Sequence, residues 1–372
     1  MKVLFFSELS GLGGGETSLL NSLIELKRRN VEVYLMCQDD GKLSKIAKQN
    51  NIKVFILPFR KKSKIILNFF KIKKIVKDNN IKILHANDIT TAALLKLIFF
   101  YNKKIKIFST CNIQFDIVKG IKKFLLKKIN CNFCVSTSVL KNLKNQKINN
   151  SVLNYLGTLP NNDKKIDIRK EIGVPENSIL IGTVARFQKI KGQLKAIKAL
   201  NKILKNNDKC YYLLIGDCIF KNDSDIKYKN EVIKYIRENN LEKKVFLLGE
   251  RKNIKQIMNS IDLLIIPSDN ESFGMVAIEA IESNLNVIST PCDGTLEIFE
   301  NKEEFFSKNI TNESLEEKII EYFENKTTKE KISNEIKKLK GKYLISNTVD
   351  CYLKYYNIWW WSIWKKIICI RI

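Results

Sequence analysis

Short apolar runs alternate with longer amphipathic stretches along most of this chain. Six runs of strand length occur in the first half, at residues 2–8, 31–37, 52–57, 81–85, 105–110 and 131–136. Five more follow, at residues 179–184, 211–215, 245–248, 261–266 and 286–289. Alternating strands and helices are typical of parallel sheets with helices on both faces, which bind ligands at the carboxyl ends of their strands. The pattern therefore predicts an α/β fold.

The two series of runs predict two domains. A chain of 372 residues is longer than a single hydrophobic core usually supports. Between Ser151 and Pro175 the regular pattern gives way to Asn, Asp and Lys with a few Gly and Pro, and we expect the linker there. This division gives an N-terminal domain over residues 1–160 and a C-terminal domain over residues 176–340.

The run at 261–266 leads into the stretch that best suggests a binding site. Pro267 ends the expected strand, and apolar residues at helical spacing predict a helix from Ser272 onward. Glu271 then falls in the strand-to-helix loop, and Glu279 lies about two turns into the helix, at the same mouth of the sheet. The start of such a helix offers backbone N–H groups to an anion, here at Phe273, Gly274, Met275 and Val276.

These two carboxylates suggest which kind of ligand would bind. A carboxylate on each side of an anion site suits a molecule with hydroxyl groups on both sides of a phosphate, as in a nucleotide-sugar. The alternative is structural: Glu271 caps the helix, and Glu279 is an ordinary solvated residue.

The loop after the run at 179–184 carries cations that suit a diphosphate. Arg186 can bind a diphosphate with two parallel hydrogen bonds, and Lys191 can act as a point charge. The glycine-rich turn at 11–15, after the first run, is likewise placed to contact a phosphate or a sugar.

This turn does not match the fingerprint of dinucleotide-binding proteins, because Glu16 stands at the last glycine position. Asp39 and Asp40 nevertheless stand where a ribose-binding acid would be found in such proteins. An NAD-dependent dehydrogenase is therefore a weaker alternative.

Positive charge is concentrated in the first half. The net charge is +26, and residues 1–160 hold 29 Lys and Arg against 9 Asp and Glu. Two stretches, 60–77 and 119–128, combine lysines with apolar residues at helical spacing. Such helices suit an anionic inner-membrane surface, although a lysine-rich solvated face gives the same pattern. We find no recognised nucleic-acid-binding module and expect no nucleic-acid partner.

Cysteine, histidine and acidic residues do not predict a metal site. Cys131 and Cys134 have a redox or zinc spacing but lie in an expected strand, and the chain has a single His. Asp223 and Asp225 form an acid pair in a polar stretch, not at an apolar strand end. With no secretory signal and no apolar span of membrane length, we expect a cytoplasmic protein.

Taken in order, these residues resemble the retaining glycosyltransferases of family 4. The resemblance rests on Arg186 with Lys191-Gly192, on Gly216-Asp217, and above all on Pro267-Ser with Glu271-Ser-Phe-Gly and Glu279-Ala. It implies the GT-B fold, two Rossmann-like domains with an interdomain cleft. The first domain would bind the acceptor and the second the nucleotide-sugar, with the last helix, about 343–372, packing back on the first.

The resemblance also assigns roles. Arg186, Lys191 and Glu271 would be catalytic, the cations stabilising the diphosphate as the glycosidic bond breaks and Glu271 accepting hydrogen bonds from the sugar. Glu279 would bind the ribose, and further donor contacts would come from Gly14, Gly15, Phe273, Gly274, Met275 and Val276. The donor would be a UDP- or GDP-sugar and the acceptor a saccharide or a lipid-linked sugar of cell-surface polysaccharide or lipopolysaccharide synthesis. No metal or cofactor is implied.

The chain departs from the family pattern on the acceptor side. Asn112 replaces the histidine of a Thr-x-His segment, and His85 keeps only the first member of a His-x-His pair, with Asn87 as the second. These three residues are the candidate acceptor contacts. Their pattern leaves open a basic GT-B-like binding protein without transfer activity. The four Trp at 359–364, beside basic residues, suit a membrane interface, and an unselected extension or an aggregation-prone tail is an equal alternative.

Overall fold

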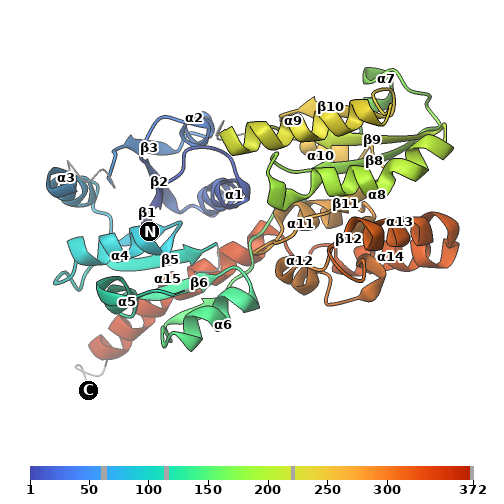
Figure 1. Cartoon of the computed structure of the whole chain (residues 1–372). Coiled ribbons are helices and arrows are strands. Elements are labelled where there is room, and N and C mark those ends of the chain that lie inside the picture. The colour runs from blue at the N-terminus through green and yellow to red at the C-terminus, as the bar shows by residue number, and fades with distance from the viewer. Residues whose placement is uncertain (60–64, 113–116, 219–222, 369–372) are drawn as a thin grey trace. The chain divides into compact units, whose positions relative to one another are not determined.

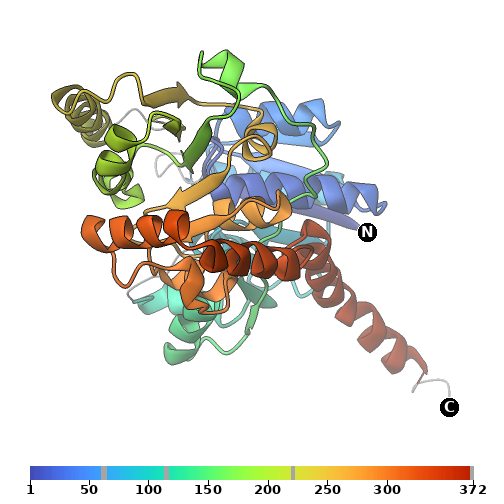
Figure 2. The same cartoon turned by 90° about the vertical axis from the view of Figure 1, so that its right-hand side faces the viewer.

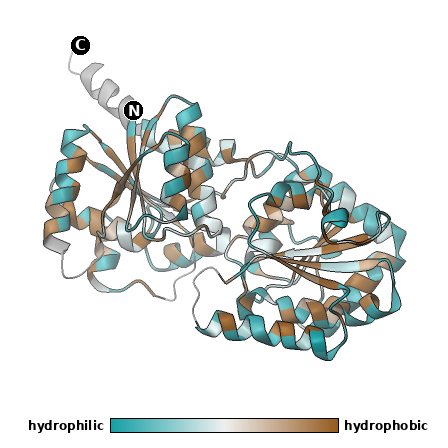
Figure 3. Ribbon diagram, turned by 90° about the horizontal axis from the view of Figure 1, so that it is seen from above, coloured by the Kyte–Doolittle hydropathy of each residue, from teal (hydrophilic) through white to brown (hydrophobic). Residues whose placement is uncertain are grey.

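The computed structural model describes residues 1–59, 65–112, 117–218 and 223–368, and their side chains up to 357 except at 65 and 66. These residues form two compact units: Met1–Leu159 with Tyr343–Ile372, and Pro160–Lys342. In each unit helices cover both faces of a parallel sheet, with apolar strands inside and two-faced helices outside (Figures 1 and 3). Arg60 to Lys64, part of one predicted basic stretch, lie outside the described residues.

The first unit is built on a seven-stranded parallel sheet in the order β3-β2-β1-β4-β5-β6-β7. The strands are β1 (Lys2–Ser7), β2 (Glu32–Cys37), β3 (Lys53–Ile56), β4 (Ile83–Ala86), β5 (Lys106–Cys111), β6 (Cys131–Cys134) and β7 (Ser151–Leu153). The strand order reverses between β1 and β4, and the loops that follow these two strands diverge there. Such a switch point is the usual ligand crevice of an open α/β sheet.

Helices of the first unit that have one face in solvent are amphipathic, and those that neighbouring elements cover on most sides are mostly apolar. They are α1 (Gly14–Arg28), α2 (Lys42–Gln49), α3 (Ile65–Asp78), α4 (Ile89–Ile98), α5 (Gly120–Leu126), α6 (Thr137–Asn145) and α15 (Ile345–Ile368). The long α15, dark red in Figures 1 and 2, comes from the far end of the chain. It joins the core through the buried side chains of Ile345, Val349, Tyr352 and Tyr356. Gly157 allows this close approach, since a Cβ there would meet the Cα of Ile345 at 2.4 Å.

The second unit has a five-stranded parallel sheet in the order β10-β9-β8-β11-β12. Its strands are β8 (Ile179–Val184), β9 (Cys210–Ile215), β10 (Val245–Gly249), β11 (Leu263–Ile266) and β12 (Val287–Ser289). The switch point lies between β8 and β11. Its helices are α7 (Ile168–Glu171), α8 (Gln193–Asn206), α9 (Asp223–Glu238), α10 (Ile254–Met258), α11 (Met275–Glu282), α12 (Asp293–Ile298), α13 (Asn312–Glu324) and α14 (Lys326–Leu339).

These two sheets confirm the predicted α/β fold of two parallel-sheet units. The structure differs from the expected linker at residues 151–175. Ser151–Leu153 forms β7, which is too short to give a clear apolar run. After it, Asn161 Nδ2 donates to Ser283 Oγ at 2.6 Å and to Asn259 Oδ1 at 2.9 Å, so this polar stretch is anchored to the second unit by side-chain hydrogen bonds.

Among the described residues, no helix combines the length and the apolar composition needed to cross a membrane.

Candidate functional site

The loops after β8 and β11 lie against each other at the switch point of the second unit. The N–H of Asp269 donates to the carbonyl of Ile190 at 2.8 Å. Gly192 lies so close to the second loop that a Cβ would meet the carbonyl oxygen of Pro267 at 2.0 Å, and its φ of +70° is the left-handed region that favours glycine. Two stretches about 80 positions apart in sequence are thus fixed backbone to backbone.

Lys191 and Glu271 form an ion pair across these loops. Lys191 Nζ lies 2.6 Å from Glu271 Oε1, and Ser268 Oγ donates to the same oxygen at 2.8 Å. The two side chains are 19% and 13% exposed, so the pair is largely shielded from water while still accessible. The sequence predicted both residues as ligand contacts, and the structure brings them together.

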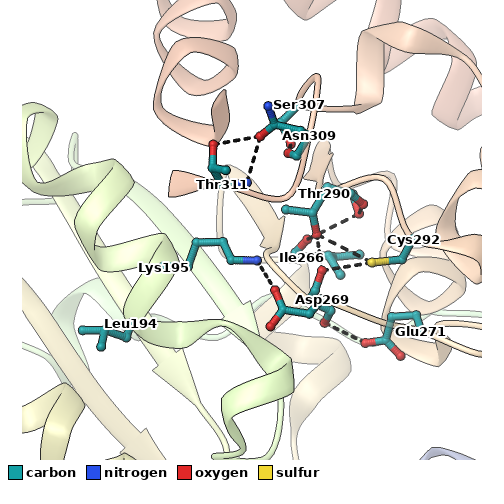
Figure 4. A network of polar contacts seen from close by, with 12 residues as sticks. Leu194, Lys195, Ile266, Asp269, Glu271, Thr290, Cys292, Ser307, Asn309 and Thr311 are labelled. Atoms are coloured by element: carbon teal, nitrogen blue, oxygen red, sulfur yellow. Dashed lines mark hydrogen bonds and ion pairs between the residues drawn. The ribbon is translucent and has the colours of Figure 1, made fainter. Parts of the chain in front are cut away.

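Residues that the sequence analysis did not single out hold the Glu271 loop in place (Figure 4). Lys195 forms an ion pair with Asp269. The carbonyl of Ser268 accepts from Thr290 Oγ1 at 2.5 Å and from Cys292 Sγ at 2.9 Å, and burial raises the pKa of the Cys292 thiol to about 11. All of them follow strand ends or begin helices, which is the one signal in the sequence that could have identified them.

The start of α11 presents its backbone beside Glu271. Gly274, with φ +103° in the left-handed region, precedes the helix, which therefore begins at Met275 and not at Ser272 as predicted. The first-turn N–H groups of Met275 and Val276 have no acceptor within their own helix because of α-helical geometry. Gly294 packs on the loop, since a Cβ there would meet the carbonyl oxygen of Phe273 at 2.4 Å. This arrangement fixes a helix start whose free N–H groups suit an anion.

Glu279 is the fifth residue of α11, about one turn from its start and not two as predicted. Its side chain is half-buried, and burial raises the pKa of the carboxyl group to about 7, an effect that the positive charge of Lys255 opposes. Burial also lowers the pKa of Lys255.

Arg186 is the third predicted donor contact, in the loop directly after β8. Its carbonyl accepts from Gln193 Nε2 at 2.6 Å, which ties the loop to the first turn of α8. Gly216 packs against the same loop, since a Cβ there would meet the carbonyl oxygen of Ala185 at 2.1 Å. The half-buried Arg186 thus starts from a fixed backbone position.

In the first unit, the predicted Gly15, Asn87 and Asn112 come together at the carboxyl ends of β1, β4 and β5. Asn112 Nδ2 donates to the carbonyl of Asn87 at 2.8 Å, and a Cβ on Gly15 would lie 3.4 Å from that nitrogen. The Oδ1 atom of Asn112 is buried without a partner among the described residues. Gly14, the other predicted glycine here, is the first residue of α1. These groups form a polar site at the switch point.

His85 lies elsewhere, in the core under α15. It is 1% exposed, its Nε2 is 2.8 Å from Thr110 Oγ1, and its Nδ1 pairs with the hydroxyl of Tyr356. The ring stacks on Phe5 with centroids 4.8 Å apart, and burial lowers the pKa of His85 to about 3. With both ring nitrogens occupied and almost no exposed surface, His85 is placed where direct contact with an acceptor is not expected.

Within the part of the chain that the structure describes, no cluster of three or more His, Cys, Asp or Glu side chains could hold a metal ion. Cys131 and Cys134 lie buried in β6, and burial raises the pKa of each thiol to about 12. Asp225 is a buried residue of α9 that accepts from Gln188 Nε2 at 3.4 Å. The cysteine pair belongs to the core of the first unit.

Two parallel-sheet units, each with a switch point in its strand order, define a two-domain α/β class of protein. Comparison with known families makes the assignment specific. A model described as "Glycosyl transferases group 1" matches residues 164–339, and one described as "Glycosyltransferase Family 4" matches residues 12–154. The chain belongs to glycosyltransferase family 4, whose fold is GT-B.

Curated relatives share a limited stretch with this chain. An O-antigen biosynthesis glycosyltransferase, WclY of Escherichia coli, is 28% identical over 138 residues, which are 37% of this chain and 36% of that protein. The UDP-Gal:alpha-D-GlcNAc-diphosphoundecaprenol alpha-1,3-galactosyltransferase of Escherichia coli is 28% identical over 133 residues, 35% of this chain and 33% of that protein. The chain thus spans about a third of the length of the curated relatives it matches.

Solved structures match over nearly the whole chain. A glycosyltransferase from Rickettsia africae has a TM-score of 0.83 at 22% identity, covering 96% of this chain and 97% of the other. Anabaena Alr3699/HepE in complex with UDP-glucose has a TM-score of 0.81 at 19% identity, covering 96% and 99%. At these identities the likeness shows the fold.

Proposed function

We propose that this protein transfers a sugar, with retention of anomeric configuration, from a nucleotide diphosphate donor to a saccharide or lipid-linked acceptor in cell-surface polysaccharide or lipopolysaccharide synthesis. The observation that carries the proposal is the Lys191–Glu271 pair at 2.6 Å beside the start of α11. It sets a cation, a carboxylate and a helix end at one switch point, as a sugar diphosphate requires. The O-antigen relative and the neighbour bound to UDP-glucose support this choice of donor and pathway class.

In this proposal each residue binds one part of the donor. Arg186 and Lys191 hold the diphosphate and stabilise the charge that builds up as the glycosidic bond breaks. Glu271 accepts hydrogen bonds from the sugar hydroxyls, and Glu279 from the ribose. The N–H groups of the loop and the first turn of α11 contact the phosphates and sugar, at Phe273, Gly274, Met275 and Val276.

The first unit would supply the acceptor contacts. Asn87 and Asn112 offer amide groups at its switch point, and Gly14 and Gly15 stay as proposed donor contacts. We assign His85 a positioning role through Thr110 and Tyr356, because it is buried. The donor would be a UDP- or GDP-sugar, and no metal or other cofactor takes part in the steps assigned to these residues.

Donor binding and turnover test this proposal. Thermal-shift measurements across UDP- and GDP-sugars should identify one donor that stabilises the protein. Glu271→Ala and Arg186→Ala should each lower kcat/KM for that donor by a hundredfold or more, because each removes about 3 kcal/mol of charge-assisted binding to the transition state. Lys234→Ala, a change at an exposed residue of α9, is the matched control. Wild-type rates in both site variants would refute the assignment.

A second candidate function is donor binding without transfer. The observation in its favour is that Asn87 and Asn112 stand where the family pattern has histidines. A protein that binds the donor tightly but neither transfers nor hydrolyses the sugar, with any of a panel of acceptors, would support this alternative. Membership of the glycosyltransferase family leaves the dehydrogenase interpretation without support.

We further propose that transfer takes place in the cytoplasm, with the protein held peripherally at the inner face of the membrane. The described cysteines all carry free thiols, as is usual in a reducing compartment. The excess of positive charge in residues 1–160 supports contact with an anionic surface. Protein that fractionates without any membrane association in cells would contradict this location.

A further inference from the structure

Several exposed apolar residues of the first unit belong to α3, to the end of α4 and to α5 and the residues beside it. These three helices lie along one side of the unit (Figure 1). We call this region the α3–α5 surface. Its apolar members, with their exposed fractions, are Leu67 (52%), Phe70 (66%), Leu97 (47%), Tyr101 (92%), Ile117 (63%), Ile121 (70%) and Phe124 (48%). Single exposed apolar residues are common in monomers, but a group of this size on neighbouring elements marks an interaction surface.

A hollow and a ring contact link the three helices of the α3–α5 surface. A hollow of about 790 Å³ lies between the second half of α3 and the end of α4, lined on one side by Lys73, Val76 and Lys77 and on the other by Leu97 and Tyr101, among others. Next to it, Phe100 stacks on Phe124 of α5 with ring centroids 6.1 Å apart. The second half of α3 and the end of α4 thus share one hollow, and the residues just after α4 contact α5.

The charge of the α3–α5 surface is predominantly positive, although α3 ends with the exposed Asp78. The stretches 65–77 and 96–106 hold four lysines each and 117–128 holds five, and none of the three contains Asp or Glu. Lys96 lies over the ring of Phe100 and Lys128 over that of Phe124, at 5.7 and 5.8 Å from the ring centroids. Burial and, as the smaller cause, repulsion by the neighbouring Lys128 lower the pKa of Lys96. An anionic partner would relieve this repulsion.

We propose that the α3–α5 surface binds a bilayer that contains anionic phospholipids. The apolar tips enter the interfacial layer, the lysines contact the phosphates, and the hollow between α3 and α4 receives one lipid head group. A row of apolar tips beside lysines fits the boundary between head groups and acyl chains. A nucleic-acid backbone has no apolar layer into which these side chains could insert. The inference deepens the membrane location proposed above and rests on it only for the choice of the inner leaflet.

The hollow lies away from the candidate acceptor contacts within the first unit. Its lining includes Ile81 and Lys82, just before β4, and Ile105, just before β5. It therefore lies at the amino ends of these strands, whereas the predicted acceptor contacts Asn87 and Asn112 follow their carboxyl ends. Membrane contact would leave the switch point of the unit uncovered.

Vesicle flotation tests the proposal with the full chain. Wild-type protein should float with phosphatidylcholine vesicles that contain phosphatidylglycerol and not with phosphatidylcholine alone. Two variants change the surface: F70S/I121S removes apolar tips, and K73E/K77E reverses two charges at the hollow. Each should lower the partition coefficient on anionic vesicles at least tenfold, because each removes apolar area or charge from the contact.

Matched controls lie in the second unit. I226S/I310S alters two side chains that are each 43% exposed, and K308E/K326E makes the same change of net charge at exposed lysines. Both should bind vesicles like the wild type. The proposal is overturned if wild-type protein has no preference for anionic vesicles, or if the controls lose binding as the surface variants do.

One further result would overturn it. Suppose that K73E/K77E weakens vesicle binding while F70S/I121S does not, and that binding to short duplex DNA responds to the two variants in the same way. The surface is then a non-specific polyanion site. Thermal stabilisation by UDP-sugars in all variants checks that the fold and the donor site are intact. If the wild-type protein binds no nucleotide-sugar, the sugar-transfer proposal is refuted. The membrane proposal is unaffected, since flotation is measured without nucleotide.

Discussion

At the residue scale, the carboxylates of the candidate donor site differ in how they are held. One oxygen of Glu271 accepts from both Lys191 and Ser268, so this carboxylate is fixed before any ligand arrives. Glu279 has a half-buried carboxyl group with a pKa raised to about 7. The first arrangement suits a residue that orients a sugar, and the second suits one whose charge follows ligand binding.

The raised pKa of Glu279 predicts a dependence of stability on pH. The folded protein holds this proton more tightly than the unfolded chain, whose reference pKa is 4.5, so folding gains stability below pH 4.5 and loses it as the pH rises towards about 7. Glu279→Gln should remove that loss and make the protein more stable at pH 8, by roughly 1–3 kcal/mol in the free energy of unfolding. Urea unfolding at pH 5.5 and pH 8 measures it.

The control is Glu231→Gln, at an exposed position of α9, which should leave the pH dependence as it is in the wild type. A Glu279→Gln variant that is no more stable than the wild type at pH 8 would show that the carboxyl group is better solvated than its raised pKa indicates.

At the scale of elements, close packing of two loops positions the candidate donor site. Gly192 and Gly173 are both glycines of the second unit with positive φ, +70° and +72°. A Cβ on Gly192 would meet the carbonyl oxygen of Pro267 at 2.0 Å, whereas a Cβ on Gly173 would meet nothing within 4 Å. The pair therefore separates the cost of backbone conformation from the cost of contact.

Gly173→Ala should cost about 1 kcal/mol in the free energy of unfolding, as expected for alanine in the left-handed region. Gly192→Ala should cost roughly 2–4 kcal/mol and should also weaken donor binding at least tenfold, because the loops of Lys191 and Glu271 must move apart. Denaturant unfolding and donor titration measure the two effects. Equal costs for both variants would mean that the loops yield without disturbing the site.

The last helix is anchored to the first unit by a buried polar network. His85 pairs with Tyr356, and Thr110 Oγ1 is 3.0 Å from the hydroxyl of Tyr352. Tyr356→Phe removes one hydroxyl and leaves a buried ring nitrogen without its partner, which should cost about 1–3 kcal/mol in the free energy of unfolding. Chemical unfolding of Tyr356→Phe and of Tyr355→Phe compares a buried hydroxyl with one on a partly buried ring. If both variants lose a similarly small free energy of unfolding, the polar network does not anchor the last helix.

At the scale of the whole molecule, the chain passes through the two units in the order first, second, first. The return places Ile345, Val349, Tyr352 and Tyr356 in the core of the first unit. Each buried side chain of this size contributes about 2 kcal/mol by removing apolar surface from water. The last helix is therefore needed for the stability of the first unit.

A chain that ends at Lys342 should show this difference in calorimetry. The unfolding transition of the first unit should shift to a much lower temperature or vanish, since the loss approaches the whole margin of about 5–15 kcal/mol of a domain. The transition of the second unit should stay where it is in the full chain. A first unit that unfolds at its normal temperature would show that α15 covers little of its core.

Much of this protein follows from local sequence. The period of apolar residues predicts both sheets, because a strand buried on both faces needs a continuous apolar run wherever it lies. The types and order of Arg186, Lys191, Glu271 and Glu279 indicate the glycosyltransferase family, because residue type and spacing can be read directly from the sequence.

Other features were decided only by tertiary structure. The sequence places His85 at a strand end beside Asn87, yet stacking on Phe5 and the arrival of Tyr356 from 271 positions away make it a core residue. The pairing of Lys191 with Glu271, the start of α11 at Met275 and the role of Gly192 likewise depend on contacts between distant segments. The local pattern of apolar and polar residues determines which helices and strands form. The burial of a side chain and its hydrogen-bond partners depend on which distant segments pack against it.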